Sequence, residues 1–316
     1  MPAKKIIAVL GATGAQGGGL AHAILADKDS EFSVRAITRD ADSDKAKELA
    51  AMGAEIVVAD IDDKESLAKA FDGAYGAFCV TFFWAHYSAE KEMAEAKIMA
   101  EAAKEAGVQH VIWSTLEDVR EWVPLTDNSM PTLHGKYKVP HFDGKGASDH
   151  FFTDAAVPTT FLLTAFYWDN LIYFGMGPKK DANGKLAVSL PMGDKKMSGI
   201  SSEDIGKCAY GIFKKGKELF GKKVGIAGEH LSGAEMAQAL SAALGKEVIY
   251  NEMTPDQYRS LGFPGADDLG NMFQFYRDFS DYFIKARDLK FAKELNPGLQ
   301  SFSEWLRKNA VRIPME

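Results

Sequence analysis

The sequence has 316 residues, 46% of them hydrophobic, and a formal net charge of −7 at pH 7. Its length allows one large globular domain with a smaller lobe, and an acidic chain without a basic stripe is a poor candidate for direct nucleic-acid binding. No apolar run is long enough for a membrane span, and the N-terminal run lacks the layout of a signal peptide. The two cysteines, Cys79 and Cys208, agree with a reducing compartment. We therefore expect a cytoplasmic protein without membrane attachment.

Short apolar runs alternate with helical patterns through the first half of the chain. The runs are apolar almost throughout, as in parallel strands covered on both faces, and they lie at Ile6–Leu10, Ser33–Thr38, Glu55–Ala59, Ala77–Thr81, His110–Ser114 and Thr159–Thr164. This alternation predicts an α/β fold, a Rossmann doubly wound parallel sheet with helices on both faces. We expect residues 1–165 to form the dinucleotide-binding domain, completed by a strand near 224–227, and residues 166–316 to form a smaller α+β lobe.

Helix signals and one long loop complete this outline. Helix starts are predicted at Asp62 with Glu65, at Ala89, at Ser232 with Glu235, and at Thr254-Pro255. Residues 115–140 contain three prolines and little periodicity, which predicts a long loop with a short helix around Glu117–Trp122. We expect residues 115–145, which include this loop, to be mobile without a cofactor and to become ordered when NADP(H) binds. The aromatic stretch Leu269–Phe283 indicates either a packing core for the lobe or a wall over a substrate.

The strongest motif directly follows the first predicted strand. It reads Gly11-Ala12-Thr13-Gly14-Ala15-Gln16-Gly17 and opens a predicted helix. Its glycines allow a tight turn, a close approach of the backbone to a pyrophosphate, and close packing of helix on strand. The helix N-terminus then presents free N–H groups to phosphates. We therefore predict a dinucleotide site that includes Gly11, Thr13, Gly14, Ala15, Gln16 and Gly17.

The ends of the next strands predict which dinucleotide binds. Thr38 and Arg39 close the second strand, where an arginine pairs with the 2′-phosphate of NADP and a carboxylate binds the 2′-hydroxyl of NAD. Arg39 favours NADP(H), although Asp40 follows it and a register shift of one residue would favour NAD. Ligands lie at the carboxyl ends of parallel strands. We therefore add Asp60, Ile61 and Asp62 near the adenine, and Thr81, Phe82 and Phe83 near the nicotinamide ribose.

Several blocks resemble one known family. The glycine motif, Val34-Arg35-Ala36-Ile37-Thr38-Arg39, His141-Phe142-Asp143-Gly144-Lys145-Gly146 and Gly262-Phe263-Pro264-Gly265-Ala266 are similar to the NmrA-like family of atypical short-chain dehydrogenases/reductases. The resemblance runs over nearly the whole chain and departs from the family pattern at 119–140. It implies a Rossmann fold that binds NADP(H), often without turnover. It also implies that Lys145 contacts the cofactor ribose and that Tyr167, Trp168 and Asn170 contact the nicotinamide end.

No complete catalytic motif stands out. Reductases of this superfamily use Tyr-x-x-x-Lys, with the tyrosine as general acid, but the corresponding block here reads His141-x-x-x-Lys145. Tyr137, His141 and Lys145 are the candidate catalytic residues, and no cluster has the spacing of a metal site. Our first hypothesis is a redox-sensing regulator with little or no turnover that signals to a protein partner. The alternative is an NADPH-dependent reductase with a small-molecule substrate and a non-standard proton donor. We expect a monomer or homodimer in either case.

Overall fold

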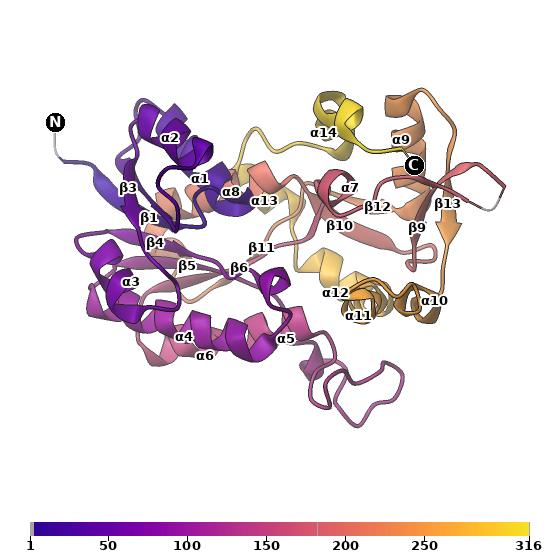
Figure 1. The fold of residues 1–316 in the computed structure, drawn as a ribbon, viewed down its shortest axis with the longest axis horizontal. Helices are drawn as coiled ribbons and strands as arrows, with labels where there is room; N and C mark the ends of the chain where they lie inside the picture. Colours follow the sequence, from indigo (N-terminus) through magenta and orange to yellow (C-terminus); the bar gives the residue numbers. More distant parts are fainter. Residues whose placement is uncertain (1–2, 182, 316) are drawn as a thin grey trace.

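The computed structural model describes residues 3–181 and 183–315, which form two halves that lie side by side (Figure 1). The larger half contains a seven-stranded sheet in the order β11-β6-β5-β4-β1-β2-β3, with every neighbouring pair parallel. Its strands are β1 (Lys5–Leu10), β2 (Phe32–Thr38), β3 (Glu55–Val58), β4 (Gly76–Cys79), β5 (His110–Thr115), β6 (Thr159–Leu163) and β11 (Lys223–Gly225). This is the Rossmann strand order with one added strand, so the predicted fold class is confirmed.

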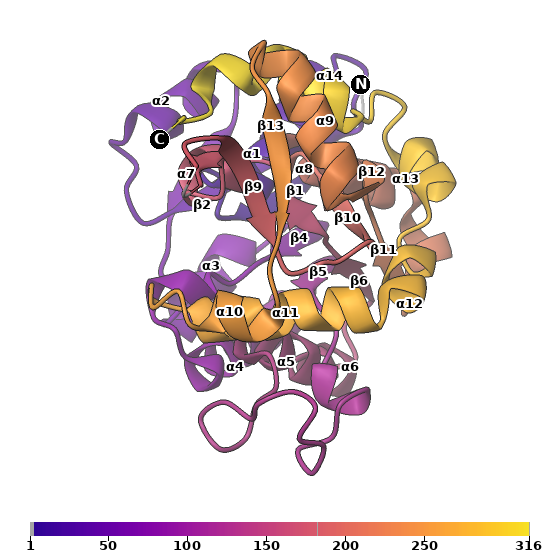
Figure 2. The same cartoon turned by 90° about the vertical axis from the view of Figure 1, so that its right-hand side faces the viewer.

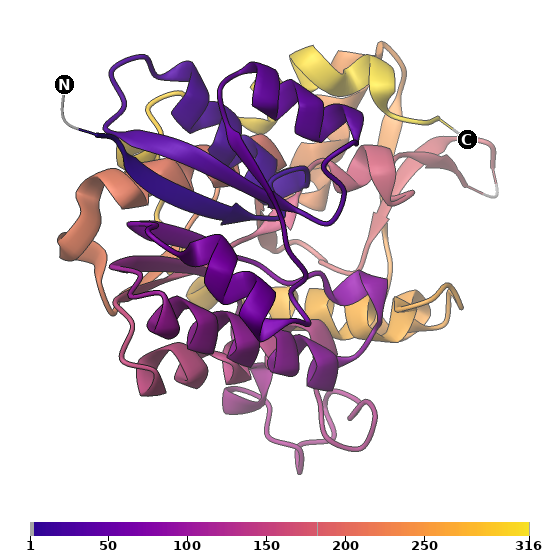
Figure 3. The ribbon, with the colours of Figure 1, turned by 60° about the vertical axis from the view of Figure 1, so that its left-hand side comes forward.

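Helices cover both faces of this sheet (Figure 1, and from another side Figure 3). One face carries α1 (Ala15–Ala26), α2 (Asp44–Ala51), α8 (Ser202–Lys215) and α13 (Leu289–Leu295), and the other carries α3 (Lys64–Phe71), α4 (Ala89–Glu105), α5 (Pro140–Ala147) and α6 (Asp149–Asp154). The predicted cap of α3 was wrong by one residue, because Asp63 is the residue whose side chain accepts the Ser66 N–H. Asp62 instead binds the ammonium of Lys91 at 2.6 Å.

The smaller half is built on two three-stranded sheets, ordered β12-β10-β7 and β13-β9-β8 (Figure 2). Their strands are β7 (Phe166–Tyr167), β8 (Lys179–Lys180), β9 (Leu186–Leu190), β10 (Lys196–Ile200), β12 (Glu229–Ser232) and β13 (Val248–Glu252). The helices around them are α7 (Asn170–Tyr173), α9 (Gly233–Leu244), α10 (Pro255–Arg259), α11 (Ala266–Asp278), α12 (Ser280–Lys285) and α14 (Phe302–Asn309). The predicted helix starts at Ser232 and Thr254 are both present, and each is a capping box.

Aromatic side chains form the core of the smaller half. Phe273, Phe275, Tyr276 and Phe283 are all buried and belong to one apolar cluster, as the packing-core interpretation predicts. Leu269, Met272 and Tyr276 of the same stretch also line the cavity described below, so the stretch serves as a wall as well. The two cysteines are free and buried, and burial raises the pKa of both thiols. Within residues 3–181 and 183–315, no helix is long and apolar enough to cross a membrane.

The loop after β5 is held in place by buried polar groups. The Asp143 carboxylate of α5 accepts N–H bonds from Val119, Lys138 and Val139 at 2.7–3.1 Å. The Lys138 ammonium donates to two carbonyls of the same loop at 2.6 and 2.7 Å, and the Asn271 amide of α11 binds the Lys138 carbonyl. A short 3-10 helix (Val119–Glu121) lies where one was predicted. These bonds tie the loop to α5 and α11, and whether it becomes more ordered when a cofactor binds stays a prediction.

Candidate functional site

A large cavity lies where the carboxyl ends of the parallel strands face the smaller half. Its volume is about 1640 Å³, and its lining comes from both halves of the molecule. Ligand pockets are commonly about 300–1,000 Å³, so this cavity has room for a dinucleotide and a second molecule. It contains the topological switch point between β1 and β4, where doubly wound sheets bind their ligands.

The glycine loop forms the floor of this cavity. Gly11 adopts φ +61°, and its carbonyl accepts the Gly14 N–H at 2.8 Å. A Cβ atom on Gly17 would lie 2.5 Å from the Gly11 carbonyl oxygen, so only glycine allows α1 to pack this closely on the end of β1. No side chain caps the first turn of α1, which leaves its N–H groups available to an anionic ligand.

One corner of the cavity, after β2, contains an exposed arginine together with the carboxylates of Asp40, Asp60 and Asp62. Arg39 is exposed, lines the cavity, and makes no hydrogen bond or ion pair to any residue that the structure describes. The Asp40 carboxylate is turned away from it in part, because its Oδ1 atom accepts the Asp42 N–H at 2.9 Å. The Lys45 ammonium of α2 donates to the Thr13 carbonyl of the glycine loop at 3.1 Å. Lys45, which does not itself line the cavity, therefore places a second cation beside the glycine loop, and it was not found from the sequence.

A second basic group lies at the end of β4. The Lys145 ammonium donates to Thr81 Oγ1 at 2.6 Å and lies 3.2 Å from the buried Glu92 carboxylate. Thr81 in turn donates to Glu92 Oε1 at 2.6 Å. This network fixes the position of Lys145 at the cavity wall, and the indole of Trp113 packs 5.2 Å from its ammonium.

Polar side chains also join the two halves across the cavity. Ser114 Oγ, at the end of β5, donates to Gln16 Oε1 at 2.8 Å, and Gln16 Nε2 donates to the Tyr167 hydroxyl at 2.6 Å. Burial raises the pKa of Tyr167 to about 12. Tyr167 therefore holds its proton at neutral pH and acts here as a structural partner of Gln16.

A histidine–aspartate pair lies at the boundary between the halves. His141 of α5 lines the cavity, and its Nδ1 atom lies 2.5 Å from Asp268 Oδ1 of α11. The other Asp268 oxygen accepts the His141 backbone N–H at 3.2 Å. His141 Nε2 has no hydrogen-bond partner among the described residues and is not among their fully buried polar atoms. The carboxylate therefore orients the ring so that Nε2 is accessible from the cavity, the arrangement of a general acid or base.

Comparison with known proteins identifies the family. The family model described as "NmrA-like family" matches residues 3–306. The chain belongs to the NmrA-like family. One relative, the NmrA-like family domain-containing oxidoreductase FrzB of Cladobotryum sp, is 30% identical over 284 residues, which cover 85% of this NmrA-like chain and 83% of the relative.

Solved structures show the same fold over nearly the whole length. NmrA, a negative transcriptional regulator solved in complex with NADP, superposes with a TM-score of 0.77 at 24% identity, covering 97% of this chain and 95% of its own. The triphenylmethane reductase of Citrobacter sp., complexed with NADP(H), has a TM-score of 0.74 at 21% identity, covering 96% and 99%.

The structure brings most of the predicted site residues of this NmrA-like protein to one cavity. Those that line it are Gly11, Thr13, Gly14, Ala15, Gln16, Gly17, Thr38, Arg39, Asp60, Ile61, Asp62, Thr81, Phe82, Phe83, His141, Lys145, Tyr167 and Asn170. Two predicted site residues, Trp168 and Tyr137, do not line the cavity. Trp168 lies in the turn after β7 and is fully buried against Phe302 and Trp305 in the core of the smaller half.

Tyr137 is the second residue outside the cavity. Its hydroxyl donates to Glu90 at 3.0 Å, and burial together with this bond raises its pKa to about 12. A tyrosine so placed is a poor proton donor to a ligand in the cavity. The residue that sequence reasoning missed is Asp268, which lies 127 positions after its partner His141.

Proposed function

We propose that this NmrA-like protein is an NADP(H)-dependent oxidoreductase. The glycine loop and the open first turn of α1 fit a pyrophosphate, and Arg39 with Lys45 fits a 2′-phosphate. Lys145, held between Thr81 and Glu92, fits the hydroxyls of a ribose. The NmrA structure in complex with NADP supports this assignment. NAD fits the same groove but leaves the Arg39 guanidinium without its anionic partner, so we propose weaker binding.

The His141–Asp268 pair carries the proposal of catalysis. A bound NADPH would supply a hydride to the substrate. His141 Nε2 would give a proton to the substrate atom that gains negative charge, and water would return the proton to His141 afterwards. Asp268 would stabilise the imidazolium and keep Nδ1 protonated, so it acts as a positioning residue. General acid catalysis of this kind is worth about 10²–10⁴-fold in rate.

Turnover in two matched variants tests this proposal. His141→Asn removes the proton donor and keeps a polar side chain of smaller size, whereas Tyr137→Phe removes a hydroxyl that lies outside the cavity. We expect NADPH oxidation with members of a panel of quinones, aldehydes and ketones, lost in His141→Asn and kept in Tyr137→Phe. Tight NADPH binding with no turnover for the whole panel would refute catalysis.

A redox-sensing regulator is the second candidate function. The observation in its favour is the missing tyrosine four residues before Lys145, where His141 stands. In that case the protein would bind NADP(H) and report its redox state to a protein partner from the cytoplasm. Partner capture that depends on whether NADP⁺ or NADPH is bound, together with no turnover, would favour this function.

A further inference from the structure

Large apolar side chains that face solvent are concentrated in one part of the cavity. Of the twelve large hydrophobic residues that are exposed in residues 3–181 and 183–315, five line this single cavity: Phe82, Tyr87, Phe174, Leu261 and Phe263. Exposed apolar patches on soluble proteins usually mark binding sites. We use the term ring compartment for the part lined by Phe82, Trp84, Tyr87, Leu261 and Phe263.

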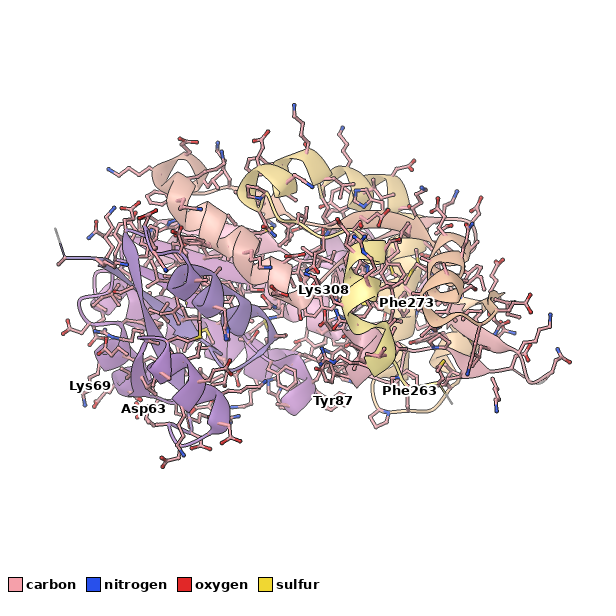
Figure 4. The ribbon with its side chains drawn as sticks, turned by 90° about the horizontal axis from the view of Figure 1, so that it is seen from above. Asp63, Lys69, Tyr87, Phe263, Phe273 and Lys308 are labelled. Atoms are coloured by element: carbon pink, nitrogen blue, oxygen red, sulfur yellow. The ribbon has the colours of Figure 1, made fainter. Side chains whose placement is uncertain are left out.

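We propose that the ring compartment binds a flat, uncharged substrate made of two or three fused aromatic rings that carries a carbonyl or another reducible polar group. The proposal rests on the proposed oxidoreductase function and names its substrate class. Aromatic rings prefer to stack on or pack edge-to-face against other rings, and the compartment offers such partners from both halves of the molecule. Figure 4 shows Tyr87 and Phe263 close to the boundary between the halves.

One end of the ring compartment is closed where the loop before α11 packs against Trp84 and Tyr87. A Cβ atom on Gly265 would lie 2.8 Å from the Trp84 ring and 3.4 Å from the Tyr87 ring, so the loop before α11 touches the segment after β4. The His141 and Trp84 rings lie 4.9 Å apart, and Phe83 packs against both. A flat molecule that packs against Trp84 would therefore lie beside the His141 ring, and a polar atom on its edge could accept a proton from His141.

The wall that the smaller half contributes to this end favours an uncharged substrate. Between 251 and 276, every side chain that lines the cavity is uncharged, including Met253, Leu269 and Met272. The charged lining residues of the smaller half are Lys179, Lys180 and Asp181 at an exposed hairpin. A carboxylate or ammonium placed against the wall from the smaller half would lose hydration without gaining an ion pair from that wall, and such a loss costs several kcal/mol in general. A small aliphatic ketone would leave most of the exposed rings uncovered.

The test is binding of phenanthrenequinone to the full chain by calorimetry, with and without NADP⁺. Leu261→Ala removes a half-exposed wall residue of the compartment, and Leu125→Ala removes a leucine of similar exposure that lies outside the cavity (51% and 42% exposed). We expect Leu261→Ala to weaken binding roughly tenfold, as loss of most of one buried leucine side chain would, and Leu125→Ala to leave it unchanged. Two comparison ligands complete the test: phenanthrene-9-carboxylate, which adds a charge to the rings, and butanone, which lacks rings.

The outcomes separate this inference from the proposed function. Equal weakening by the two leucine substitutions, or binding of the carboxylate or butanone as tight as that of phenanthrenequinone, would overturn the substrate class. Phenanthrenequinone binding that depends on Leu261, in a protein that binds NADPH without oxidising it, would support the ring compartment and refute turnover. A separate titration of NADPH fluorescence reports cofactor binding in every variant.

Discussion

Arg39→Ala should remove most of the preference for NADP(H) over NAD(H). Arg39 is exposed and makes no bond to the rest of the described chain, so its removal costs little folding free energy. A charge-assisted hydrogen bond to a phosphate contributes about 1.5–3 kcal/mol. The expected preference of the unaltered protein is therefore roughly tenfold to a hundredfold. NAD(H) lacks the 2′-phosphate, so its affinity should stay unchanged in the variant.

Lys45 provides an internal comparison for this prediction. Its ammonium is held 3.1 Å from the Thr13 carbonyl, so it can add a second, weaker attraction for the phosphate. Arg39→Ala should then leave a residual preference that Lys45→Ala removes in the double variant. Both effects should shrink in high salt, because exposed charge pairs are screened.

Titration calorimetry of the unaltered protein, Arg39→Ala and the double variant, each with NADP⁺ and with NAD⁺, measures these six affinities directly. The reasoning fails if Arg39→Ala keeps the full preference for NADP⁺ over NAD⁺. It also fails if Arg39→Ala weakens the binding of NAD⁺ as strongly as the binding of NADP⁺. The first result would mean that another group recognises the phosphate. The second result would mean that Arg39 maintains the shape of the groove and does not discriminate between NADP⁺ and NAD⁺.

Three further predictions concern other parts of the molecule. Asp268→Asn should lower kcat by a factor of about 10²–10⁴, because the amide no longer holds His141 in the productive tautomer, while NADPH affinity stays the same; stopped turnover with equally weakened NADPH binding would contradict the positioning role. Burial lowers the pKa of His110 from its ordinary 6.5 to about 4. The unfolded chain therefore binds this proton more readily, and the free energy of unfolding should fall by about 2 kcal/mol between pH 7 and pH 5. Urea denaturation should show this loss, and His110→Leu should reduce it. Hydrogen exchange should find the Val119 and Val139 amides protected in the apo protein, since both donate to Asp143; fast exchange that slows only when NADP(H) is added would restore our original expectation of a mobile loop.

The sequence predicted the features that depend on local patterns. Strand–helix alternation fixes the large sheet, and the glycine loop needs only the residues from Gly11 to Gly17, so both were predicted correctly. Features that depend on contacts between distant segments were not visible. Asp268 carries no motif that connects it to His141, and the anchoring of residues 116–139 depends on α11, more than a hundred residues later. The Trp168 error was of a different kind, because the resemblance assigned a whole segment to the cofactor, whereas the Trp168 indole packs against Phe302 and Trp305 in the core of the smaller half.

The origin of the two cavity walls constrains how such proteins can be recombined. The dinucleotide groove comes mainly from residues before 116, whereas the outer wall comes mainly from residues after 165. A chimera that keeps the first segment and takes the second from a relative could exchange substrate range while retaining its coenzyme. The hydrogen bond between His141 and Asp268 crosses that junction. A functional exchange must therefore carry an acidic residue at the corresponding turn of α11, or the transplanted pocket would lose the carboxylate that orients its proton donor.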